Sequence, residues 1–156
     1  LGIRRPTLAS FGIAVACAVV VIVLFALCYS VVFPAFGVAA VPTRLATIAQ
    51  EPLWLTLLIT LRAGIVEEFL FRFYPIGRLA TATGSIALAV IVPGLVFIGL
   101  HAGGWGVMHL VPVTLATIVF TLLYLWKRDF WCSALAHFLV DFITFAAAHA
   151  AAGHAG

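Results

Sequence analysis

Residues 8–33 read LASFGIAVACAVVVIVLFALCYSVVF and contain no charged side chain. An apolar run of about 18 residues or more is long enough to cross the hydrocarbon core of a bilayer as an α-helix. The whole chain has the same character, since 65% of its 156 residues are hydrophobic and only 8% are charged. In a soluble domain about a quarter of the residues are charged. This chain has too little polar surface for a water-soluble domain, and we expect lipid to be its main solvent.

Four more apolar segments follow the first, separated by prolines, glycines and charged residues that are typical of helix ends. Pro93 and Gly94 indicate an interruption of the third segment, and residues 102–106 indicate a glycine-rich turn after it. We therefore predict an all-α, polytopic transmembrane helix bundle of about five spans. The expected spans are 8–33, 53–74, 86–100, 109–126 and 130–148, with the second ended by Pro75, Gly77 and Arg78.

The basic residues predict the orientation, because cytoplasmic loops carry an excess of lysine and arginine. With the N-terminus in the cytoplasm, only Arg44 falls outside. The residues that fall inside are Arg4, Arg5, Arg78, Lys127 and Arg128. Five spans then place the C-terminus outside. We expect a leading helix and linker over residues 1–51, a catalytic helix bundle over 52–149 and a tail over 150–156.

Five ionisable residues in or next to the expected spans stand out: Glu67, Glu68, His101, His137 and Asp141. Each charged group at the centre of a span costs at least about 2.5 kcal/mol, so such groups usually mark function. They belong to three different spans, which a helix bundle would bring together. Three other histidines are expected to be non-catalytic, because one lies at the outer interface and two on the tail: His109, His149 and His154.

The two neighbouring glutamates are expected to have different roles. Glu68 and Arg72 are four residues apart with the carboxylate on the N-terminal side, which is the favourable order for an ion pair on a helix. Glu67 is rotated by about 100° from Glu68, and we expect Gly64 and Phe71 on its face. Glu67 is therefore the predicted free carboxylate and Glu68 the structural partner of Arg72.

The same four-residue spacing places Phe97 and His101 on one helix face, and His137 and Asp141 on another. A carboxylate one turn from a histidine can fix the tautomer of the imidazole and increase its basicity. Together with Glu67, these groups predict a functional site inside the membrane and not a purely structural cluster.

At these residues the chain resembles the CPBP family of intramembrane proteases. This family is also called ABI, comprises CAAX proteases and bacteriocin-processing enzymes, and is related to type II CAAX prenyl endopeptidases. The segment EEFLFR (67–72) resembles its EExxxR motif, FIGLH (97–101) its FxxxH motif and HFLVD (137–141) its HxxxN/D motif. The resemblance covers residues 52–148, and the ordered set of three motifs is more specific than any one of them.

The resemblance implies an intramembrane endopeptidase whose active site opens to the cytoplasm of a prokaryotic cell. It implies that Glu67 is the general base on a water, helped by His101. His137 and the residue at position 141 would stabilise the oxyanion, while Glu68, Arg72 and Phe97 support the site. The expected partners are membrane lipid and a peptide or membrane-protein substrate, without nucleic acid; the oligomeric state stays open.

Position 141 leaves three interpretations open, because it is Asp where the prenyl-protein branch of the family has Asn. An ionised carboxylate only accepts hydrogen bonds and does not donate to an oxyanion. Asp141 is therefore either protonated or acts by orienting His137. A zinc site formed by Glu67, His101 and His137, with Asp141 as a further or outer ligand, is a third interpretation. We favour no metal, because the EE motif lacks the HExxH spacing of a zinc helix.

Two other classes of function compete with a protease. A non-catalytic scaffold or immunity protein of the same fold would use the polar cluster only to hold its helices together. A proton-relaying transporter subunit would use the carboxylates and imidazoles as a relay. The small number of spans and the lack of two similar halves argue against a transporter.

Overall fold

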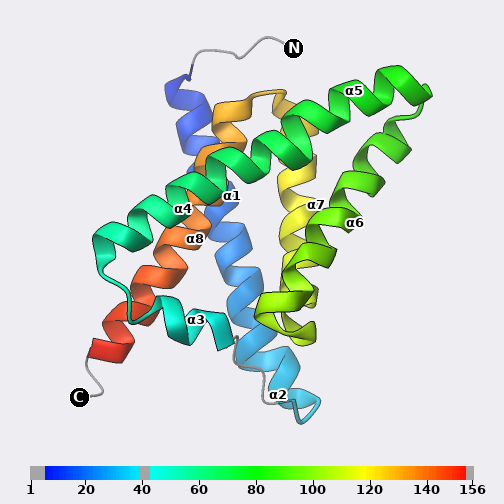
Figure 1. The fold of residues 1–156 in the computed structure, drawn as a ribbon. Helices are drawn as coiled ribbons and strands as arrows, with labels where there is room; N and C mark the ends of the chain where they lie inside the picture. Colours follow the sequence, from blue (N-terminus) through cyan, green and yellow to red (C-terminus); the bar gives the residue numbers. More distant parts are fainter. Residues whose placement is uncertain (1–5, 39–42, 154–156) are drawn as a thin grey trace.

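The computed structural model describes residues 6–38 and 43–153, and their regular elements are all helical. Figure 1 shows them as one bundle. Two of the elements, η1 and η2, are single π-helical turns within longer helices, and η3 is a short 3₁₀ turn. In chain order the elements are α1 (Leu8–Leu27), η1 (Cys28–Val32), α2 (Phe33–Ala35), α3 (Thr43–Ile48), α4 (Leu53–Glu68), η2 (Phe69–Phe73), α5 (Tyr74–Thr83), α6 (Ile86–Trp105), η3 (Val107–His109), α7 (Leu110–Lys127) and α8 (Phe130–Gly153).

The expectation that Pro75 ends the second helix is wrong. Helix continues without a break from Leu53 through η2 to Thr83, where Gly84 takes the left-handed conformation (φ 67°) that ends many helices. A proline inside a helix lacks an N–H and crowds the carbonyl four residues earlier. The π turn comes directly before Pro75, with the amide of Tyr74 bonded five residues back to Phe69. This wider turn relieves the crowding, so the helix passes through the proline.

Pro93 and Gly94 do not interrupt α6 either. The turn expected at residues 102–106 is also wrong, because α6 continues to Trp105 and only Gly106 leaves the helical conformation. Prolines are tolerated in membrane helices because neighbouring groups compensate for the lost backbone hydrogen bond. The last helix also runs further than expected, since α8 continues through Gly153 into the predicted tail. The predicted linker contains a helix of its own, α3.

The longer second helix explains how His101 reaches the depth of Glu67. Thr83 lies 16 residues after Glu67, or about 24 Å of helix, and His101 lies 15 residues after Ile86, or about 22 Å. The chain therefore goes out along α5 and returns along α6 by nearly equal lengths. Both helices meet at the turn of Gly84 and Ser85, where the Ser85 side chain caps α6 by accepting from the Leu88 amide.

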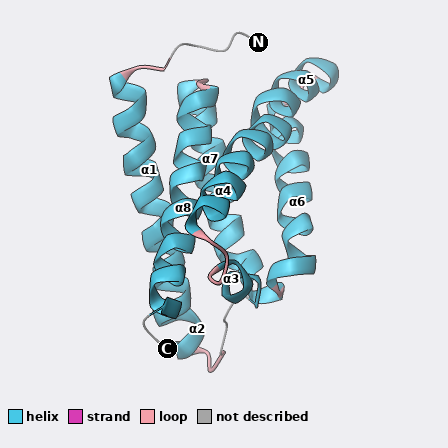
Figure 2. Ribbon diagram, turned by 60° about the vertical axis from the view of Figure 1, so that its left-hand side comes forward, coloured by secondary structure: helices cyan, strands magenta, loops and turns pink. Residues whose placement is uncertain are grey.

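Helix α8 is the centre of the bundle and packs against α1, α4 and α7. Its contact with α4 depends on Gly64, where a Cβ would lie 2.7 Å from the carbonyl oxygen of Ala134 and 2.9 Å from the amide nitrogen of Phe138. The α4–α5 helix crosses the bundle obliquely, as both views show (Figures 1 and 2). At the start of α8, Asp129 accepts from the amides of Trp131 and Cys132 and from the Ser10 hydroxyl, which joins α8 to α1.

The bundle has two distinct ends. The first turn of α1 and the α7–α8 connection lie at one end, and α2, α3 and the last turns of α8 lie at the other (Figures 1 and 2). We call the second of these the α3 end. A hydrogen bond agrees with this arrangement, since the imidazole Nδ1 of His149 in α8 donates to the carbonyl oxygen of Ala49, just after α3.

Four helices in the described residues are long and apolar enough to cross a membrane. They cover Leu8–Ala35, Ile86–Trp105, Val107–Lys127 and Phe130–Gly153. The oblique α4–α5 helix is not among them and carries Arg62, Glu67, Glu68, Arg72 and Arg78. The chain is therefore an all-α, polytopic integral membrane protein, whereas the fifth span and the orientation stay predictions.

Candidate active site

A cavity of about 750 Å³ lies in the half of the bundle nearer the α3 end. Its walls come from α1, η1, α3, α4, η2, α6, η3, α7 and α8, so residues far apart in the chain meet there. Most of the lining side chains are apolar. The ionisable ones are Arg44, Arg62, Glu67, His101, His109, His137 and Asp141, with the hydroxyl of Tyr29 beside them.

The predicted ion pair of Glu68 and Arg72 is confirmed, and both side chains are fully buried. Arg72 Nη1 donates to Glu68 Oε1 over 2.8 Å, and the guanidinium also lies over the ring of Phe97 at 4.3 Å. Glu68 is more than a partner of Arg72, however. The same Oε1 atom accepts from His137 Nδ1 over 2.9 Å, which joins α4 to α8. Because a carboxylate oxygen accepts, His137 carries a hydrogen on Nδ1.

Glu67 faces the cavity, as its rotation from Glu68 predicts. The other cavity-lining residues of its helix face include Ala63 and Phe71, spaced four apart. Gly64 does not share this face, contrary to expectation. It lies on the buried stripe of α4 that also contains Thr56, Thr60 and Glu68 and packs on α8.

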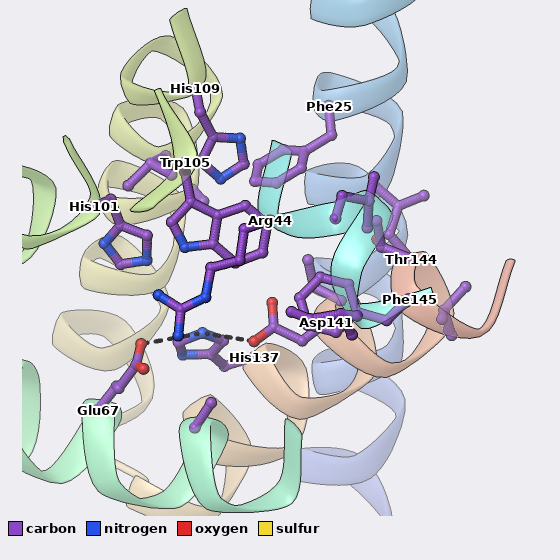
Figure 3. A pocket seen from close by; sticks show the side chains of 18 of the residues that line it. Phe25, Arg44, Glu67, His101, Trp105, His109, His137, Asp141, Thr144 and Phe145 are labelled. Carbon is purple, nitrogen blue, oxygen red and sulfur yellow. Dashed lines mark ion pairs between the residues drawn. The ribbon is translucent and has the colours of Figure 1, made fainter. Parts of the chain in front are cut away.

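His137 stands between the two cavity carboxylates (Figure 3). Its Nε2 atom lies 3.5 Å from Asp141 Oδ2 and 3.8 Å from Glu67 Oε2. The ring stacks on Phe120, with centroids 5.0 Å apart and an interplanar angle of 23°. Since Glu68 holds Nδ1, the orientation of this imidazole is determined mainly by Glu68 and Phe120. Nε2 is left facing Glu67 and Asp141.

His101 is held from its own helix. Its Nδ1 atom lies 2.8 Å from the carbonyl oxygen of Phe97, which can only accept, so Nδ1 carries the hydrogen. In the neutral ring Nε2 is then an acceptor. The Phe97 ring packs against His101, His137 and Phe71, so it separates the polar groups and keeps them in place.

Comparison with known proteins identifies the family. The family model described as type II CAAX prenyl endopeptidase Rce1-like matches residues 49–143. The chain belongs to this family. Neither the comparison with curated proteins nor that with solved structures gave a match. The matched region of this Rce1-like protein contains all three motif segments, and α1 and α3 lie before it.

Several cavity residues of the Rce1-like chain were not predicted as site residues. His109 was expected at the outer interface, but it is buried and lines the cavity together with Tyr29, Arg44 and Trp105. Arg44 enters from α3, with its Cζ 5.8 Å from the centre of the Trp105 ring (Figure 3). No motif marks these residues. These residues line the cavity because α1 and α3 fold over the helices that carry the motifs.

The side chains considered for zinc do not form an evident metal site. In residues 6–38 and 43–153, no group of three or more His, Cys, Asp or Glu side chains is arranged to hold a metal ion. Glu67 and Asp141 lie near His137, whose Nδ1 is occupied by Glu68, while His101 is tied to Phe97. These contacts occupy Nδ1 of each imidazole and leave both Nε2 atoms open. No step below depends on a metal.

Proposed function

We propose that this Rce1-like protein is an intramembrane endopeptidase that hydrolyses a peptide bond with a water activated by Glu67. The observation that supports this proposal is that the two neighbouring glutamates have different environments. Glu68 is buried and bound to Arg72 and His137, whereas Glu67 lines the cavity beside His137 and Asp141. A general base needs a carboxylate that can reach water and substrate, and Glu67 meets this condition.

The proposed reaction follows from these positions. Glu67 removes a proton from a water, and the oxygen attacks the carbonyl carbon of the scissile peptide bond. His101, with its Nε2 free to accept, helps to hold this water. Negative charge develops on the former carbonyl oxygen, where preorganised donors lower the barrier most. The carbon–nitrogen bond then breaks, and the proton held by Glu67 passes to the leaving nitrogen.

The proposed oxyanion donor is Nε2 of a doubly protonated His137, since Nδ1 already donates to Glu68, and Asp141 acts through this imidazole. Glu68 on Nδ1 holds the ring in place, and the carboxylates near Nε2 favour a donor at that nitrogen. Asp141 would be a poor direct donor, because an ionised carboxylate has no hydrogen to give. We therefore propose that Asp141 polarises His137 and completes the orientation that Glu68 and Phe120 mainly determine.

The mechanism is proposed to be metal-free, with water and protein side chains alone. A chelator should leave the cleavage rate unchanged, as measured on enzyme purified in metal-depleted detergent buffer. Loss of activity on chelation that zinc restores would instead assign the chemistry to a metal.

The side of the membrane from which substrate enters is open to a direct test. The cavity lies towards the α3 end, whereas Arg78, Lys127 and Arg128 lie at the opposite end. An N-terminus in the cytoplasm would therefore place this half of the bundle nearer the outer side. The distribution of basic residues favours an opening on the outer side, whereas the family resemblance implies the cytoplasmic side.

The decisive experiment compares wild type with Glu67→Gln, purified and reconstituted in lipid vesicles. The probe is a mixture of internally quenched fluorescent peptides. We expect cleavage by the wild type and a loss of at least 100-fold in the variant, since general acid–base catalysis typically contributes 10²–10⁴-fold. The melting temperature should change little, because the 3.8 Å contact of Glu67 with His137 is longer than a hydrogen bond.

Full activity in Glu67→Gln would refute the role of this base. Peptide cleavage by neither protein would favour a scaffold of the same fold. Proton uptake by the vesicles, absent in Glu67→Gln, would favour a transporter subunit.

A further inference from the structure

The leading helix contributes to the cavity, although it lies outside the residues that match the family. Ile22, Phe25, Ala26 and Tyr29 of this segment all line the cavity. The π turn η1 includes Tyr29. Such turns shift the helix register by one residue and are frequent at functional sites. Tyr29 is the polar member of this wall, so its hydroxyl needs an explanation.

Tyr29 binds His109 across the cavity wall. The hydroxyl oxygen lies 2.6 Å from His109 Nδ1. A phenol O–H is a better donor to an imidazole nitrogen than an imidazole N–H is to a phenol oxygen, because the imidazole nitrogen is the stronger base. The tyrosine hydroxyl therefore donates, and Nδ1 accepts. In the neutral imidazole the hydrogen must then be on Nε2.

The His109 ring is held rigidly in this tautomer. Trp105 stacks on one face with centroids 4.8 Å apart and an interplanar angle of 18°, and Phe25 meets the ring edge at 86°. His109 is 8% exposed. Within the described residues no hydrogen bond occupies Nε2, so the ring offers a fixed N–H donor to a mostly apolar cavity.

We propose that His109 is a substrate-binding residue that donates from Nε2 to a backbone carbonyl of the bound peptide, and that Tyr29 is its positioning residue. This inference rests on the proposed protease function. A peptide in this cavity loses the water that solvates its carbonyl groups, and each needs a donor. Figure 3 shows His109 beside Trp105, away from the Glu67–His137–Asp141 group. The contacted carbonyl therefore belongs to a residue beside the scissile bond, and binding strength is the property affected.

The first test is Tyr29→Phe, which removes the hydroxyl and keeps the ring that packs edge-on against Phe33 at 5.3 Å. With the peptide that wild type cleaves fastest in the quenched mixture, we expect KM to rise roughly 2- to 10-fold, as for one neutral hydrogen bond, with kcat nearly unchanged. Tyr74→Phe is the matched control, because Tyr74 is half-exposed and does not line the cavity. Its KM should equal that of the wild type.

The second test distinguishes the loss of the Nε2 hydrogen-bond donor from the loss of the packing of the His109 ring. A glutamine side chain can place an amide donor near the position of Nε2, so His109→Gln should retain most of the wild-type affinity. His109→Leu should lose it. A melting temperature measured for each variant checks folding, and the recovery in His109→Gln is a result that a purely structural role would not produce.

Unchanged KM in both Tyr29→Phe and His109→Leu would overturn the inference while leaving Glu67-dependent cleavage, and thus the proposed function, intact. A fall in kcat alone would also overturn it, since it would assign the pair to the chemical step. Absence of any Glu67-dependent cleavage overturns both proposals.

Discussion

Glu68 has the most constrained environment of the motif residues. One oxygen accepts from both Arg72 and His137, and neither Glu68 nor Arg72 has appreciable exposure. The position therefore links stability and site geometry. A sequence pattern shows the Arg72 contact, because it lies one turn away on the same helix. It does not show the His137 contact, because that residue comes from a different helix.

Glu68→Gln should lower stability by about 3 kcal/mol, because removing one partner of a buried ion pair leaves the other charge uncompensated. Thermal unfolding in detergent measures this effect. Replacing both partners, as Glu68→Leu with Arg72→Met, should recover much of the stability. It should not recover cleavage, because His137 still lacks its Nδ1 acceptor. Equal melting temperatures of wild type and Glu68→Gln would contradict the structural role.

Asp141 is predicted to act through His137. Asp141→Ala should lose roughly 10- to 100-fold in kcat, as is typical when an orienting partner of a functional group is removed. Asp141→Asn keeps an oxygen that accepts hydrogen bonds, so it should retain most of the activity. The pH dependence of the rate is the check: an alkaline decline in wild type that disappears in Asp141→Asn would show that the carboxyl itself must donate.

At the scale of elements, the close contact of α4 with α8 positions the side chains of the site. Gly64 allows the two helices to approach so closely that Glu68 meets His137. Gly64→Ala should lower stability by about 1–3 kcal/mol, the usual cost of overpacking, and should reduce cleavage by separating the two helices. Gly12→Ala in α1 is the control, since nothing lies within 4 Å of the added carbon. An unaffected melting temperature in Gly64→Ala would mean that the helices adjust without loss.

The two π turns show how prolines and functional side chains are accommodated within long helices. The turn η2 lets the helix continue through Pro75, which extends α5 and lets α6 return His101 to the site. The turn η1 includes the residue that reaches His109. Glycine and proline in a sequence usually predict the end of a helix. Where a π turn accommodates the residue and neighbouring helices pack against it, the helix continues and that prediction fails.

At the scale of the whole molecule, the orientation decides which compartment the cavity faces. We expect reporter fusions after Arg78 and Lys127 to be cytoplasmic and a fusion after Gly106 to be external, because the basic residues cluster at the end opposite α3. Measurement of alkaline phosphatase and fluorescent-protein signals in parallel checks both sides. Arg4 and Arg5 support the same orientation but lie outside the described residues. A cytoplasmic fusion after Gly106 would reverse the topology and place the half of the bundle that contains the cavity on the cytoplasmic side.

The sequence by itself determined the fold class and the family. Long uncharged runs require helices in lipid, and the three motifs depend on spacings of a few residues within single helices. Local spacing likewise separated Glu67 from Glu68, because a rotation of about 100° per residue is a property of any α-helix.

Only the tertiary structure decided which groups complete the site. Glu68 contacts His137, and Tyr29 contacts His109, across 69 and 80 residues of chain. Such pairs depend on helix crossing, on the close approach at Gly64 and on the register set by π turns. These features arise from packing between helices, and no spacing within one helix encodes them.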